Sequence, residues 1–174
     1  MKRILALVLG LMMILCTAAA AAETTEKTEL GSVEAYTIQG VIPEGYSFNI
    51  ITSGGLNLIG MLVGGEGKPM ITVSIAYNEE YADVERFNDV DEVTVEEIKE
   101  SFLDMDDVAF EDLETAYGTR LLKVTQADKA FADIYSIYKG YENEFVMVAQ
   151  GEVTETDIQM LVDFISSIDY IAVK

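Results

Sequence analysis

Residues 116–150 read AYGTRLLKVTQADKAFADIYSIYKGYENEFVMVAQ, and this stretch decides the fold. Three runs rich in apolar, β-branched and aromatic residues alternate with short polar breaks, a pattern that predicts consecutive antiparallel strands. In the last run every residue from Phe145 to Ala149 is apolar, although successive side chains of a strand point to opposite faces. We therefore expect this strand to lie centrally in a sheet with cover on both faces. Val146 and Val148 should meet one layer, and Phe145 and Met147 the other.

Two further groups of elements complete the expected fold. Alternating apolar and polar residues predict four more strands between residues 35 and 77, separated by glycine-containing turns. Thr94 with Glu97 fits a capping box at the start of one helix, and Thr154 with Asp157 fits the start of a closing helix. This order predicts an α+β fold, with a mainly antiparallel β-sheet flanked by helices in an α-β-α sandwich.

The N-terminus has the pattern of a secretory signal peptide over residues 1–22. Lys2 and Arg3 precede a twelve-residue apolar run, and a stretch of alanines offers small residues for cleavage. The apolar run is short for a membrane span, so we expect a secreted or extracytoplasmic protein with no membrane insertion after signal cleavage. Cys16 would be the site of a lipoprotein anchor, but Leu15 stands where a small residue is expected, which argues against lipidation.

The remaining chain divides into a short lead-in and one domain. Residues 23–33 are polar and rich in Thr and Glu, which predicts a flexible acidic tether. Residues 34–174 have the length of a single domain with its own core. Cys16 is the only cysteine and would leave with the signal, so neither disulfides nor thiol chemistry are expected in the mature protein.

Charge and composition exclude several classes of function. The chain has 11 basic and 31 acidic residues and no histidine. Such a protein repels phosphate backbones, which excludes nucleic acid and favours cations or a basic protein partner. Without histidine or a mature cysteine, the common zinc sites and nucleophilic triads are excluded. A small carboxylate-dependent hydrolase is one alternative, but no nucleophile–base pair is evident, and we expect no enzyme and no bound cofactor.

A second alternative is low-affinity calcium binding by the acidic segment from Glu79 to Glu114, which holds sixteen carboxylates. Two groups within it approach the spacing of an EF-hand loop, but Val93, Thr94 and Ala109 stand where that loop needs oxygen ligands or glycine. Calcium would therefore need an irregular site, and the other interpretation is a solvated acidic face. The candidate metal ligands are Asp89, Asp91, Asp104, Asp106 and Asp107.

Tyrosines in the predicted strands could form a surface for a protein partner, since tyrosine is enriched at interfaces. The candidates are Tyr135, Tyr138 and Tyr141. The other interpretation is that they lie at the edge of the core with a solvated hydroxyl.

The layout also resembles the PsbP-like superfamily, which includes the Mog-type Ran-binding proteins and many short secreted bacterial proteins. The resemblance rests on Tyr36-Thr37-Ile38 leading to Ile42–Tyr46, on Tyr117-Gly118-Thr119 at the start of a strand, and on the hairpin from Ile134 to Ala149. It implies an α-β-α sandwich and a role in binding or assembly, with no shared catalytic residues. We therefore expect an exported, non-enzymatic binding or assembly module whose ligand or partner is unknown.

The signal peptide predicts the N-terminus of the mature protein. Intact-mass measurement of the protein released by its host should show a chain that starts near Glu23. A mature species that starts at an acylated Cys16 would contradict this prediction and would place the protein at a membrane surface.

Overall fold

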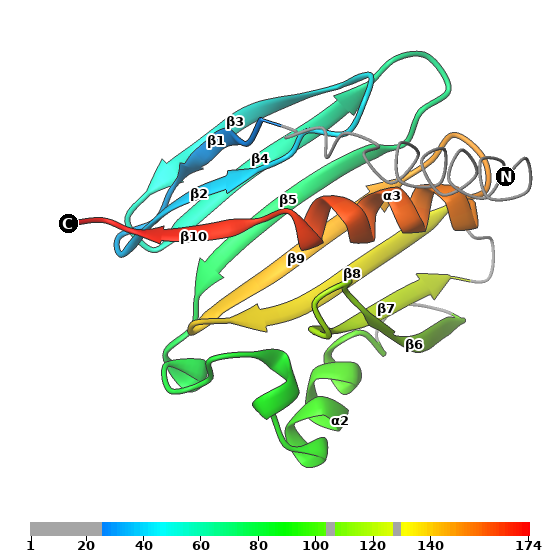
Figure 1. Cartoon of the computed structure of the whole chain (residues 1–174). Coiled ribbons are helices and arrows are strands. Elements are labelled where there is room, and N and C mark those ends of the chain that lie inside the picture. The colour runs from blue at the N-terminus through cyan, green and yellow to red at the C-terminus, as the bar shows by residue number, and fades with distance from the viewer. Residues whose placement is uncertain (1–25, 104–106, 127–129) are drawn as a thin grey trace, which may run out of the picture.

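The described part of the protein has an α+β fold of two antiparallel sheets and two α-helices (Figure 1), and this fold class agrees with the prediction from the sequence. This computed structural model describes residues 26–103, 107–126 and 130–174. The predicted signal peptide and the first part of the predicted tether lie outside these ranges. No helix within them is long and apolar enough to cross a membrane.

The larger sheet has seven strands in the order β3-β4-β5-β9-β8-β7-β6. The apolar strand β9 pairs with β5 on one side and β8 on the other, which confirms its expected central position. In chain order these strands are β3 Tyr46–Gly54, β4 Asn57–Gly64, β5 Met70–Tyr77, β6 Val108–Glu114, β7 Arg120–Gln126, β8 Phe131–Tyr138 and β9 Tyr141–Val148.

The smaller sheet lies with helix α3 on one face of the larger sheet (Figure 1). It has the order β1-β2-β10, with β1 Thr28–Ser32, β2 Tyr36–Gly40 and β10 Asp169–Ala172. Helix α3, Glu155–Ser166, begins with the expected capping box, since Asp157 donates its amide to the Thr154 hydroxyl over 3.2 Å and its carboxylate accepts the Thr154 amide. Buried residues of α3, β1, β2 and the strands β4, β5, β7, β8 and β9 form the main core on this face.

A smaller core lies on the opposite face, under helix α2 (Glu92–Ser101) and the two 3₁₀ helices η1 (Glu79–Tyr81) and η2 (Phe87–Asp89). Its buried members are Phe87, Val90, Val95, Ile98, Leu122, Val124, Tyr135 and Ile137. The strand residues among them belong to β7 and β8 alone. On this face, the buried layer therefore covers β7 and β8 but not the strands at the other edge of the sheet. Helices therefore flank both faces of the sheet, but unequally.

The expectation that residues 145–149 are covered on both faces is wrong for the C-terminal end of β9. Phe145 and Met147 are buried in the main core, whereas Val146 is half-buried and Val148 is 46% exposed. The reason is the position of α2, which packs over β7 and β8 and leaves the end of β9 open to solvent.

Strand β1 is a second correction, because residues 28–32 were expected to belong to a flexible tether. Leu30 and the following Val33 are buried, at 0% and 2% exposure. A β-bulge between Glu29 and Gly31 interrupts the alternation of β1, so its strand pattern cannot be recognised from period two. The short strand β10 was also not expected; it pairs with β2.

The start of α2 is a third correction. Asp91, not Thr94, caps the helix, because its carboxylate accepts the amides of Val93 at 2.9 Å and Thr94 at 3.0 Å. These bonds to the ionised form lower the pKa of Asp91, with the bond from the Thr94 amide contributing most. The helix therefore starts earlier than the Thr94–Glu97 pattern indicates.

The unequal cover of β9 gives a test with two neighbouring residues. Met147→Asp should lower the free energy of unfolding by more than about 4 kcal/mol, because it buries an unpaired charge. Val148→Asp should cost no more than about 1 kcal/mol, because the carboxylate reaches solvent. Urea unfolding of both variants measures the difference. Equal costs would show that the open end of β9 is covered in solution.

Candidate functional site

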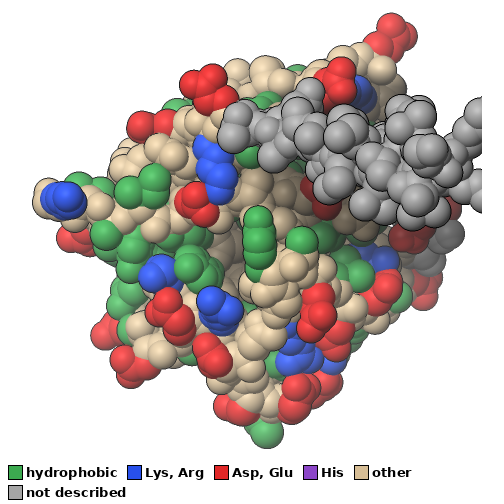
Figure 2. Space-filling model, viewed as in Figure 1, with side chains coloured by type: hydrophobic (Ala, Val, Ile, Leu, Met, Phe, Trp, Pro, Cys, Tyr) green, Lys and Arg blue, Asp and Glu red, His purple; other side chains and the backbone are tan. Residues whose placement is uncertain are grey.

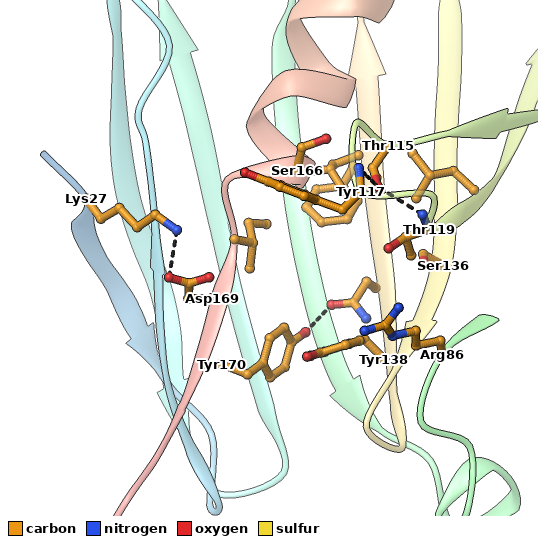
Figure 3. Close-up of a pocket in the computed structure, with 15 residues that line it drawn as sticks. Lys27, Arg86, Thr115, Tyr117, Thr119, Ser136, Tyr138, Ser166, Asp169 and Tyr170 are labelled. Carbon is orange, nitrogen blue, oxygen red and sulfur yellow. Dashed lines mark hydrogen bonds and ion pairs between the residues drawn. The ribbon is translucent and has the colours of Figure 1, made fainter. Parts of the chain in front are cut away.

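A cavity of about 350 Å³ opens on the α3 face of the sheet, and we take it as the candidate functional site. One side is formed by the end of α3, the residues after it and β10; the other by strands β7–β9 and the loop from Thr115 to Thr119 (Figure 3). Its size is at the lower end of the range found for small-molecule sites. On the face seen in Figure 2, Lys and Arg side chains lie among acidic ones.

Asn143 and Tyr170 join the two sides of the cavity. Asn143 is 5% exposed; its amide nitrogen donates to the Tyr141 carbonyl over 2.9 Å, and its oxygen accepts the Tyr170 hydroxyl. The Tyr170 ring also packs edge-on against Tyr138, with 4.9 Å between centroids. Burial raises the pKa of the Tyr170 phenol, so this hydroxyl stays neutral and acts as a hydrogen-bond donor.

The loop from Thr115 to Thr119 forms a wall of the cavity that is closed by its own hydrogen bonds. The buried Thr115 hydroxyl accepts the amides of Tyr117 at 3.3 Å and Thr119 at 3.1 Å, while the Thr115 amide donates to the Thr119 carbonyl at 2.9 Å. Asn88 holds the loop from outside, since it donates to the Gly118 carbonyl and accepts the Arg120 amide. The cavity wall is therefore set by hydrogen bonds within the protein that need no ligand.

Charged residues line the opening of the cavity. Lys27 and Asp169 form an ion pair at 2.6 Å, and Arg86 lies beside Tyr138 (Figure 3). Next to Tyr138 in sequence, Lys139 pairs with Glu85 at 3.2 Å, and this hydrogen bond raises the pKa of the Lys139 ammonium. Two cations and one carboxylate thus belong to the lining, an excess of one positive charge in a protein of net charge −20.

Two hydroxyls of the lining donate to oxygen atoms of the protein that are not carboxylates. Ser136 donates to the Arg120 carbonyl over 3.4 Å, and Tyr170 donates to an amide oxygen, so neither hydroxyl faces a general base. Apolar side chains complete the wall, among them Leu121, Phe145 and Ile168. Such a mixture of hydroxyls, one uncompensated charge and an apolar wall is typical of a site for a small organic ligand.

The predicted metal ligands that the structure describes form no cluster that could hold a metal ion. Asp91 caps α2, and the Asp89 carboxylate accepts the Arg86 amide at 3.1 Å. Asp107 lies in a turn before β6, while Asp104 and Asp106 lie outside the described residues. Within the described ranges, no group of three or more acidic side chains could hold a metal ion. Calcium binding remains an expectation from sequence.

Of the three predicted partner-surface tyrosines, two are buried on opposite faces. Tyr135 is 6% exposed and lies in the core under α2, and Tyr141 is 3% exposed in the main core. Only Tyr138 lines the cavity. The sequence offered these tyrosines as a possible surface for a protein partner, but it contains no signal for which face each tyrosine would occupy.

A buried carboxyl group lies on the other face of the same strands. Asp133 is 1% exposed, between Val124 and Val146 of the neighbouring strands, and its Oδ1 has no hydrogen-bond partner among the described residues. Burial, together with the nearby Glu144 carboxylate, raises the pKa of Asp133 to about 8. Asp133 is therefore protonated at neutral pH.

Comparisons with protein-family models, with curated proteins and with solved structures find no match to this chain.

Asp133 predicts a pH dependence of stability. Its pKa is raised in the folded state, so the folded protein binds this proton more tightly than the unfolded chain. The contribution of Asp133 to stability should be largest at acidic pH and should fall as pH rises towards 8, by at most about 1.4 kcal/mol per pH unit. Asp133→Asn should remove this part of the dependence in urea unfolding between pH 5 and about 8. Asp83→Asn, at an exposed carboxylate, is the matched control. Identical pH profiles for wild type and Asp133→Asn would contradict the prediction.

Proposed function

We propose that this chain is an exported, non-enzymatic binding module that takes a small organic molecule into the cavity between β10, the end of α3 and strands β7–β9. The observation that carries the proposal is a preformed cavity of about 350 Å³ in which hydroxyl, amide and cationic groups converge on one space. The signal-like N-terminus and the resemblance to the PsbP-like superfamily, whose members are mostly binding or assembly factors, support the same general role.

Rigidity of the lining supports binding. The Thr115 hydroxyl fixes the loop wall through two amides, and Asn143 connects β9 to β10 through Tyr170. A site held in this way loses little conformational entropy when a ligand enters, because its groups are already ordered. The apolar part of the wall, with Phe145 and Leu121, adds the favourable transfer of a hydrocarbon group out of water.

The chemistry of the lining also supports binding over catalysis. The pKa of Tyr170 is raised by burial, which is the opposite of what an activated phenolate needs. The Asp169 carboxylate is held by Lys27 at 2.6 Å and has no hydroxyl partner in the described part of the chain. A protein of this kind would recognise or carry its ligand without changing it.

Blocking the cavity tests the proposal. Ligand-observed NMR at millimolar concentration would use four probes: benzoate, benzamide, glucose and glycine betaine. At least one should bind the wild-type protein, and Thr119→Phe, which places a ring on the cavity wall, should abolish that binding. Thr52→Phe, the same change at an exposed position of β3 on the edge of the sheet, should leave it intact. Binding that persists in Thr119→Phe, or no binding of any probe to the wild-type protein, would overturn the proposal.

A further inference from the structure

The backbone fixes Arg86 at the rim of the cavity. The turn between β8 and β9 donates the amides of Lys139 and Gly140 to the carbonyls of Glu85 and Val84, each over 3.0 Å. Arg86 itself forms an antiparallel bridge with Tyr138, the last residue of β8. Backbone contacts therefore hold Arg86 in place, and its exposed side chain is not needed to anchor this segment.

The side chain of Arg86 is the uncompensated charge of the cavity. Lys27 is paired with Asp169, and the neighbouring Lys139 with Glu85. The nearby Asp89 carboxylate accepts the Arg86 backbone amide, and within the described ranges no carboxylate forms an ion pair with the guanidinium. In Figure 3 the guanidinium lies beside the Tyr138 ring, among the groups that line the cavity. An unpaired cation is unexpected in a chain with 31 acidic residues.

We propose that the ligand is a small organic monocarboxylate, bound with its carboxylate on the Arg86 guanidinium and its hydrocarbon body against the apolar wall of the cavity. This inference rests on the proposed function and deepens it. The planar guanidinium can donate two parallel N–H bonds to the two oxygens of a carboxylate. Around the same space, the hydroxyls of Tyr138 and Thr119 can donate further neutral hydrogen bonds.

The charge of the ligand follows from the charge of the site. The lining has one excess positive charge, and the whole chain has a net charge of −20. A monoanion would be neutralised by Arg86 alone, whereas a dianion such as a phosphate monoester would keep a negative charge inside a negative protein. A neutral ligand would supply no opposite charge to Arg86, whose guanidinium forms no ion pair within the described residues.

The apolar part of the lining indicates that the ligand has a hydrocarbon group besides its carboxylate. Leu121, Phe145, Ile165 and Ile168 supply an apolar wall, and Phe145 is 1% exposed in the main core. Apolar groups gain roughly 25 cal/mol per Å² on leaving water, which favours a carboxylate with a hydrocarbon body over acetate or formate. The volume of about 350 Å³ suits an acid of the size of benzoate and excludes a folded peptide.

Titration calorimetry with benzoate and its neutral isostere benzamide tests the inference. Wild type should bind benzoate more tightly than benzamide, and Arg86→Gln should weaken benzoate at least about tenfold, because a charged hydrogen bond is lost. Arg86→Lys should restore part of the affinity, since it returns the charge without the two-pronged geometry. Lys99→Gln removes one positive charge from α2, outside the residues that line the cavity, and should leave benzoate binding unchanged. Inorganic phosphate should bind more weakly than benzoate.

The outcomes separate this inference from the proposed function. If benzamide binds as well as benzoate and both are lost in Thr119→Phe, the cavity is a binding site but the carboxylate inference is wrong. Unchanged benzoate affinity in Arg86→Gln overturns the inference in the same way. If neither benzoate nor benzamide binds the wild-type protein, the inference is overturned as well, and the proposed function then depends on glucose and betaine. Equal melting temperatures of Arg86→Gln and wild type show that the variant is folded.

Discussion

The turn between β8 and β9 is the constraint on which the rest of the structure depends. Lys139 and Gly140 both have positive φ, at 53° and 78°, the backbone combination that suits a tight hairpin between twisted strands. This turn places Tyr138 opposite Tyr141 and so sets the register in which Phe145 and Met147 face the main core. A shift of one residue would turn these two side chains towards the other face. The amides of the same two turn residues hold the segment that carries Arg86, so one short turn determines both the core and one edge of the cavity.

The part of the fold that is visible in the sequence is the part with a regular period. Strands β2–β5 and β7–β9 and helix α3 could be predicted because apolar side chains recur every second residue or along one helical face. Strands β1 and β10 could not, because β1 contains a bulge and β10 has four residues with no buried member. The start of α2 was assigned to the wrong residue because Asp91 and Thr94 both fit a helix cap, and only the geometry shows that the Asp91 carboxylate receives the amides.

The candidate site could not be predicted, because its residues come from distant parts of the chain with no common motif. Lys27, Arg86 and Asp169 meet at the opening only through the pairing of β10 with β2 and the docking of the 84–86 segment on the β8–β9 turn. Of the residues that the sequence analysis singled out, Tyr138 lines the cavity, and so do Tyr117 and Thr119 of the Tyr117-Gly118-Thr119 segment, which was expected only to start a strand. There Gly118, with φ of 74°, allows the tight loop that Thr115 closes.

Net charge was the strongest feature of the sequence, but it does not predict the sign of the charge that one site on the protein can bind. A total of −20 favours cationic partners when the protein is seen from a distance, because the field sums over the whole surface. Close to the protein the field is set by individual groups. Arg120, for example, takes two carboxylates, Asp112 and Glu92, each at 2.9 Å. The local potential around Arg86 therefore depends on how the nearby acids are engaged: Glu85 forms an ion pair with Lys139, and the Asp89 carboxylate accepts the Arg86 backbone amide. A strongly acidic protein can thus hold a site for an anion, provided that the fold assigns the surrounding carboxylates to other partners.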